Sequence, residues 1–175
     1  TDYPAFCKSI GAERFSANLV IPAGRGENEG LTVTYSEIGD IVRKLKAEAI
    51  KQGIRFMWYS PTPVCLFNPL AEGFGNRGCS ACEGLLSVDP NGNVLPCSSW
   101  SEPVGNLLEE GFEKVWNSQR CRWIRAKESA PAECKQCRHF AACQGACPLY
   151  FGVHGNNELV SEWEAAGLVR EGCIV

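Results

Sequence analysis

Four cysteines stand within fourteen residues of this chain, in the segment "CKQCRHFAACQGAC" that runs from 134 to 147. Their spacing is C-x2-C-x5-C-x3-C, and a close CxxC pair can bind two corners of one compact metal site. Thiolates grouped in this way bind either zinc or an iron–sulfur cluster. The first question is therefore which metal site these cysteines hold, and which other residues complete it.

The chain has eleven cysteines, an odd number that excludes a complete disulfide framework. Clustering at CxxC spacing favours metal binding in a reducing compartment over disulfides. Besides the block at 134–147, an upstream set of three cysteines and several isolated cysteines are present. The upstream set is Cys79, Cys82 and Cys97, and the isolated ones are Cys7, Cys65, Cys121 and Cys173.

A turn sequence lies between two cysteines of the upstream set. The segment "LLSVDPNGNVLPC" reads as a β-hairpin with the turn "DPNG", in which Gly92 is the turn residue. Cys82 and Cys97 lie at the two ends of this hairpin. Its geometry therefore predicts that Cys82 and Cys97 face one site.

Composition limits the function further. The chain has 175 residues, 45% of them hydrophobic and 21% charged, with a formal net charge of -3. No basic block favours nucleic acid as a partner, and no apolar run approaches the length of a membrane span. The first residues lack the basic and apolar regions of a secretory signal. We therefore expect a cytoplasmic protein that binds neither nucleic acid nor membrane.

The first third of the chain has an α/β pattern. Residues 2–11 suggest the end of a helix, and "RFSANLVIP" a strand. Thr34 and Glu37 fit a capping box, Gly53 a helix stop, and between them Ile38, Ile41, Val42, Leu45 and Ala49 fall at helical spacing. A short, mostly buried strand, "IRFMWYS", follows, and the order strand–helix–strand predicts a parallel pair.

Pro and Gly punctuate the chain after residue 61, and we place a domain boundary near residue 65. Residues 106–127 predict one or two helices, with Leu108, Phe112, Val115 and Trp116 on one side. Residues 129–155 predict a cysteine-bearing loop region. A last short helix is expected over 156–169, with Asn157 as its cap.

The cysteine pattern as a whole resembles the seven-cysteine signature of the SPASM domain. This domain is the auxiliary-cluster module at the C-terminus of many radical S-adenosylmethionine (radical SAM) enzymes. The resemblance covers residues 79–175, and "SVDPNGNVLPC" and "VGNLLEEGFEKVWNS" are similar to connecting segments of that family. The signature reads C-x9-G-x4-C, then C-x2-C-x5-C-x3-C, then a last cysteine; its positions are Cys82, Cys97, Cys134, Cys137, Cys143, Cys147 and Cys173.

The resemblance implies two [4Fe-4S] clusters. The first would use Cys82, Cys97, Cys147 and an upstream cysteine, either Cys79, which forms a CxxC with Cys82, or Cys65. Two-cluster ferredoxins also send the last cysteine of a similar run to the other cluster, in agreement with the place of Cys147. The second cluster would use Cys134, Cys137, Cys143 and Cys173. Below, the first cysteine group is Cys79, Cys82, Cys97 and Cys147, and the second is Cys134, Cys137, Cys143 and Cys173.

The same resemblance implies a mixed fold, α/β plus α+β. Residues 1–64 would be the last strand–helix units of a radical SAM partial (β/α) barrel. Residues 65–175 would be a loop-rich SPASM domain, with a β-hairpin and short helices around the two Fe-S clusters. Cys7 and Cys121 are expected to be packing residues, and His139 a group near the clusters or on the surface.

The chain also departs from the family, because no CxxxCxxC motif for the cluster that cleaves S-adenosylmethionine is present. We therefore expect a fragment of a radical SAM oxidoreductase or maturase that is not competent alone. The complete enzyme would add S-adenosylmethionine, a third [4Fe-4S] cluster and an N-terminal radical SAM region. It would modify a peptide or a cofactor precursor, with a flavodoxin- or ferredoxin-like reductant. The alternatives are a zinc-stabilised interaction module and a standalone one-electron carrier.

Overall fold

The computed structural model describes residues 2–24, 26 and 33–168. Its first part is a strand–helix–strand unit preceded by the short helix α1 (Tyr3–Ser9). Strand β1 (Arg14–Ala17) pairs in parallel with β2 (Arg55–Trp58), as the element order predicts. Only Trp58 of β2 is buried, so the strand is less buried than its sequence suggests. The described residues thus contain one parallel strand–helix–strand unit, and its place in a barrel stays a prediction.

Helix α2 (Tyr35–Gln52) connects the two strands and has the predicted ends. The backbone N–H of Thr34 donates to the carboxylate of Glu37 at 2.9 Å, which confirms the capping box. Gly53 ends the helix in the left-handed conformation, with φ 61°. Ile38, Val42 and Ala49 are buried, whereas Ile41 is 38% exposed at the edge of the predicted apolar face.

The predicted hairpin is the second sheet. Strand β3 (Ser87–Val88) pairs antiparallel with β4 (Asn93–Leu95), and β5 (Gly105–Asn106) adds a third strand. The carboxylate of Asp89 accepts the backbone N–H groups of Asn91 and Asn93, so the side chain closes the turn. Gly92 has φ 82°, a conformation that favours glycine.

Replacing Gly92 with alanine should therefore destabilise the hairpin. Its left-handed backbone strains any L side chain, and an added Cβ would lie 2.6 Å from Cγ of Leu108. We expect a loss of about 1–2 kcal/mol, which lowers the midpoint of thermal unfolding by roughly 2–8 °C. Gly84→Ala is the matched control, because its Cβ would meet no atom within 4 Å. Equal melting midpoints for the two variants would contradict this account of the turn.

The segment after the hairpin forms three short helices instead of one or two. They are α3 (Leu107–Glu110), α4 (Phe112–Trp116) and α5 (Gln119–Arg125). Gly111 at φ 75° separates the first two, and the Ser118 side chain caps the third. Because the helix is interrupted, the predicted apolar side that would include both Leu108 and Val115 is not formed. Val115 is buried, but Leu108 is 81% exposed.

Short helices also replace much of the loop expected over 129–155. They are α6 (Ala132–Gln136), α7 (Phe140–Cys143) and α8 (Pro148–His154). The last described helix is α9 (Asn157–Ala165), and Asn156 precedes it as the N-cap, one residue before the predicted cap. Within the described ranges, no helix combines the length and hydropathy needed to cross a membrane.

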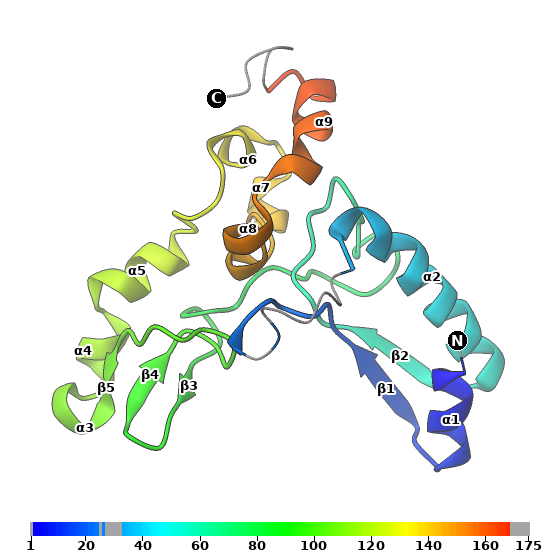
Figure 1. Ribbon diagram of the computed structural model, residues 1–175, viewed down its shortest axis with the longest axis horizontal. Helices are drawn as coiled ribbons and strands as arrows, with labels where there is room; N and C mark the ends of the chain where they lie inside the picture. Colours follow the sequence, from blue (N-terminus) through cyan, green and yellow to red (C-terminus); the bar gives the residue numbers. More distant parts are fainter. Residues whose placement is uncertain (1, 25, 27–32, 169–175) are drawn as a thin grey trace.

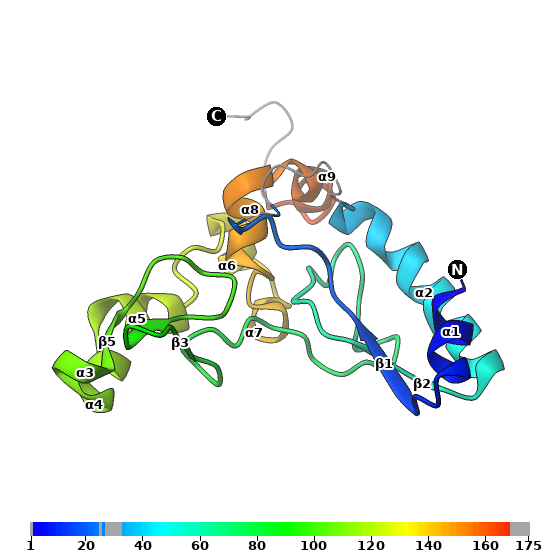
Figure 2. The same cartoon turned by 60° about the horizontal axis from the view of Figure 1, so that its bottom comes forward.

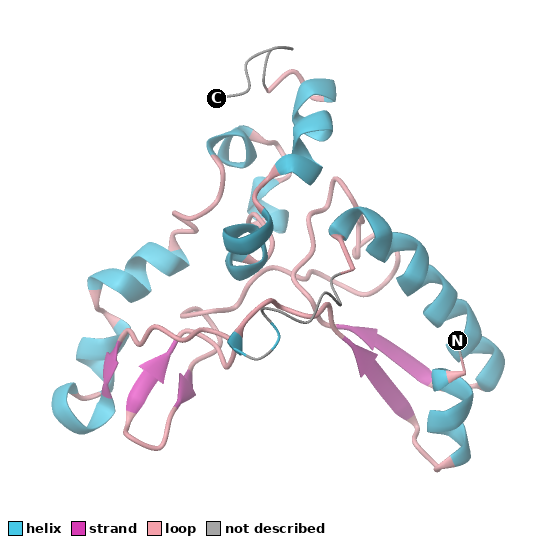
Figure 3. Cartoon of the chain, viewed as in Figure 1, coloured by secondary structure: helices cyan, strands magenta, loops and turns pink. Residues whose placement is uncertain are grey.

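The two sheets lie at opposite ends of the fold. Helices α6 to α9, coloured yellow to orange-red, lie above and between the sheets in this view (Figure 1). Figure 2 shows the same separation after a turn of the molecule. Long irregular segments connect the elements in the middle, as the pink loops of Figure 3 show. The cysteines of 79–97 lie on irregular backbone, and those of 134–147 lie on or beside the short helices α6 to α8.

A buried aromatic contact joins the cysteine-bearing helices to the N-terminal unit. Tyr150 of α8 and Tyr35 of α2 are both fully buried, with ring centroids 4.2 Å apart. The hydroxyl of Tyr150 accepts the backbone N–H of Tyr35 at 3.3 Å and donates to Glu158 of α9. Glu158 also accepts the backbone N–H of Ser36 at 2.8 Å. This network fixes α8, and with it Cys147, against the start of α2.

Candidate metal centres

The structure divides the cysteines of the 134–147 block between two places. Cys134, Cys137 and Cys143 line one cavity of about 680 Å³. Cys147 is not among its lining residues and lies instead in the core that contains Tyr35 and Tyr150. The block therefore serves two separate regions of the fold.

Three successive left-handed residues produce this division. Gln144, Gly145 and Ala146 have φ of 56°, 75° and 60°. Left-handed backbone is unfavourable for the two residues that are not glycine, so the surrounding contacts must hold it. The chain turns sharply between Cys143 at the end of α7 and Cys147 at the start of α8. Cysteines only four positions apart therefore face different sites.

Cys147 lies with cysteines of the hairpin region. Burial, together with the neighbouring Cys79 and Cys97, raises the pKa of the Cys147 thiol to about 11. Backbone N–H groups of Tyr150 and Leu149, in the first turn of α8, oppose that rise in pKa. The structure thus places Cys79 and Cys97 in the neighbourhood of Cys147.

Cys82 belongs to the same region and is fully buried, with φ 53°. Burial, together with Cys121 and Cys79, raises the pKa of its thiol to about 12. The thiol of Cys121 on α5 donates to the Cys82 sulfur at 3.0 Å. Cys121 is a buried packing residue, as expected, but its sulfur contact with a candidate ligand was not foreseen.

Two cations of the α5 region fix the loop that carries Cys79 and Cys82. Nζ of Lys127 donates to the backbone carbonyl of Cys79 at 2.6 Å and pairs with Glu83 at 2.8 Å. The guanidinium of Arg125 donates to the carbonyl of Cys82 at 3.1 Å. These contacts hold a loop with no strand of its own, and they place positive charge beside thiolates that would bear negative charge.

Apolar side chains and cysteines together line the cavity of the second group. Besides Cys134, Cys137 and Cys143, its lining includes Trp163 and Leu159 of α9, both buried. Burial raises the pKa of the Cys134 thiol to about 11, while a side-chain hydrogen bond from Trp163 lowers it. The backbone N–H of His139 donates to the Cys137 sulfur at 3.4 Å. Cys173, the fourth predicted member of this group, lies outside the described residues.

One more thiol lines this cavity. Cys65 stands beside the three cysteines of the second group instead of the first group, for which it was the alternative ligand. Partial burial, together with the neighbouring Cys143, Glu162 and Cys134, raises the pKa of the Cys65 thiol to about 12. No sequence pattern signals this position, because Cys65 stands far from the block in the chain.

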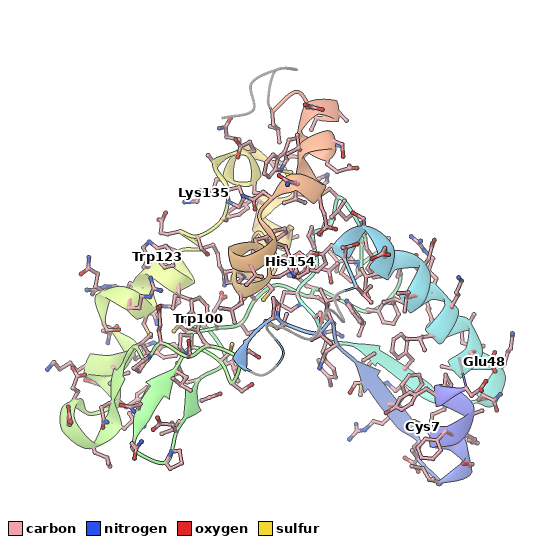
Figure 4. The ribbon with its side chains drawn as sticks, viewed as in Figure 1. Cys7, Glu48, Trp100, Trp123, Lys135 and His154 are labelled. Carbon is pink, nitrogen blue, oxygen red and sulfur yellow. The ribbon has the colours of Figure 1, made fainter. Side chains whose placement is uncertain are left out.

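Cys7 is remote from both groups. It is buried in a small core with Phe15, Ala49 and Ile54, at the far end of the N-terminal unit (Figure 4). It is a packing residue, as its isolated position predicts.

The cavity of the second group has room for a compact inorganic core, and Cys134, Cys137 and Cys143 line it. Among the side chains that the structure describes, no three of His, Cys, Asp or Glu converge closely enough to hold one metal ion. Because burial raises the pKa of the Cys134 thiol, cluster binding would release its proton.

Comparisons with known proteins agree with the cysteine pattern. Residues 79–138 match the SPASM family, an iron–sulfur cluster-binding domain. The AdoMet-dependent heme synthase of Oleidesulfovibrio alaskensis is 26% identical over 169 residues, which cover 86% of this chain and 43% of that protein. The AdoMet-dependent heme synthase of Methanosarcina barkeri is 23% identical over 164 residues, covering 85% of this chain and 47% of that protein.

The chain spans less than half the length of these two curated relatives. No solved structure matches it significantly.

Proposed function

We propose that this chain holds the auxiliary clusters of a radical SAM enzyme, because residues 79–138 match the SPASM iron–sulfur cluster-binding family and the chain is similar to two AdoMet-dependent heme synthases. The observation that carries the proposal is the division of the cysteines between two sites. Cys79, Cys82, Cys97 and Cys147 would hold the first [4Fe-4S] cluster. Cys134, Cys137 and Cys143 would hold the second, with Cys173 as the fourth ligand that the sequence predicts.

Bound clusters would supply one-electron redox chemistry or an iron for substrate binding. The residues around them set the conditions for that chemistry. Lys127 and Arg125 place positive charge beside the loop of Cys79 and Cys82, and the backbone N–H of His139 donates to the Cys137 sulfur. Such charges and hydrogen bonds raise the reduction potential of a thiolate-bound cluster.

The larger protein would use S-adenosylmethionine, as the names of the relatives state for them. Its cleavage would need a third cluster and an N-terminal radical SAM region, since this chain has no CxxxCxxC motif. Of the two substrate classes expected, a peptide and a cofactor precursor, the heme synthases support the cofactor precursor. A flavodoxin- or ferredoxin-like protein is the proposed source of electrons.

Metal analysis after anaerobic reconstitution tests the proposal. We expect about eight iron and eight acid-labile sulfide per chain, with the broad visible absorption of thiolate-bound clusters. The control is the same protein supplied with zinc instead of iron and sulfide, because thiolate sites also bind zinc. A colourless product that takes up about two zinc but no iron or sulfide would favour the zinc-stabilised module.

A further inference from the structure

The first cysteine group has a fifth thiol beside it, on helix α5. Cys121 and Cys82 are both fully buried, in one core with Val94, Val115 and Ile124. The thiol of Cys121 donates to the Cys82 sulfur at 3.0 Å. Cys121 is not one of the seven signature positions, and the first cluster already has four candidate ligands without it. Its contact with a ligand sulfur therefore needs another explanation.

Helix α5 contacts Cys82 through two side chains that are one turn apart. Cys121 and Arg125 are four positions apart, so their side chains lie on the same face of the helix. The guanidinium of Arg125 donates to the backbone carbonyl of Cys82 at 3.1 Å and to that of Trp116 at 2.9 Å. The backbone N–H of Cys121 donates to Oγ of Ser118, the cap of this helix, at 3.2 Å. These hydrogen bonds hold the Cys121 sulfur beside the Cys82 sulfur.

Packing alone needs a small apolar side chain at this position, but not a hydrogen-bond donor. Cys7 illustrates that case, because its core consists of Phe15, Ala49 and Ile54. Cys121 instead lies 3.0 Å from a sulfur that would carry negative charge when bound to iron. The position of Cys121 is therefore suited to act on the cluster through Cys82.

Iron binding would fix the direction of this hydrogen bond. A cysteine that ligates iron is a thiolate without a proton, so Cys82 can only accept and Cys121 must donate. A thiol is a weak donor, but a charged acceptor strengthens the hydrogen bond. Both residues are 0% exposed, so the bond lies where the effective dielectric constant is low and bulk water does not compete for it.

We propose that Cys121 is a positioning residue that hydrogen-bonds the Cys82 thiolate and raises the reduction potential of the first cluster. The inference rests on the proposed function. Reduction adds one electron from a flavodoxin- or ferredoxin-like donor to the cluster, while the proton stays on Cys121. The added negative charge falls partly on the ligand sulfurs, so a donor at Cys82 stabilises the reduced cluster more than the oxidised one.

An EPR-monitored redox titration of Cys121→Ala, Cys121→Ser and the wild type tests the proposal. The first-cluster signal is the one that Cys147→Ala removes. At a fixed solution potential, Cys121→Ala should lower the ratio of reduced to oxidised first cluster about tenfold, equal to about 59 mV for one electron. Cys121→Ser keeps a donor at this position and should restore most of that ratio. The second cluster, and both clusters of Cys7→Ala, should keep wild-type ratios.

The serine variant decides the outcome if the alanine variant loses the first cluster. A serine variant that then holds the cluster at the wild-type potential supports the hydrogen bond. A serine variant that also loses the cluster shows that Cys121 binds iron or is required for folding, and the inference fails. It also fails if Cys121→Ala retains the wild-type potential, or if both variants shift equally. Each of these results leaves iron binding by the wild type intact, whereas a wild-type protein without iron would refute the proposed function itself.

Discussion

Cys147→Ala should remove the first cluster and leave the second, although Cys147 lies only four positions from a second-group cysteine. The expected result follows from the left-handed turn at 144–146, which directs Cys147 toward Cys79 and Cys97. Loss of one of its four thiolates should abolish most of the EPR signal of the first cluster, because the cysteine-bearing loops hold the cluster mainly through these thiolates. Spin-quantified EPR of the reduced protein measures both clusters in one sample.

Cys143→Ala is the matched comparison, and it should remove the second cluster while the first remains. The two variants change the same residue type within the same short turn. General damage to residues 143–147 would therefore affect both clusters in both variants. If the two variants lose the same signal, the cysteines do not divide between two sites.

Removing the metal should loosen the cysteine-bearing segment much more than the N-terminal unit. Helices α6 and α7 have five and four residues, lengths that are not stable as isolated helices in water. Their burial is also slight, since neither contains a buried residue. Cluster binding should therefore supply much of the free energy that orders residues 129–146.

Hydrogen exchange before and after anaerobic chelation of the iron measures this difference. Amides in 129–146 should lose at least about tenfold in protection. Amides of α2 and β2, over 35–58, serve as the internal control and should change by less than about twofold. Equal protection of 129–146 in the metal-free and loaded proteins would show that this segment folds without a cluster.

Much of the local structure could be predicted because short-range chemistry determines it. Thr34 and Glu37 are three positions apart, and the capping box between them needs no distant partner. Asp89 and Gly92 likewise specify the hairpin turn within four residues. The parallel pairing of β1 and β2 also follows from the order of the elements.

Contacts between distant segments could not be predicted in the same way. Cys65 and Cys121 stand alone in the sequence, and only the tertiary fold places them at the cavity and beside Cys82. The division of residues 106–125 into three helices depends on the positive φ of Gly111 and the cap at Ser118, which interrupt an otherwise helical pattern. Leu108 consequently leaves the face that it would share with Val115 in one continuous helix.

Native mass spectrometry of the anaerobically reconstituted chain tests the central claim most directly, because it counts intact cofactors on each molecule. The account predicts one dominant species, the chain carrying two [4Fe-4S] clusters. A dominant species with a single cluster, or with zinc ions and no sulfide, would contradict it.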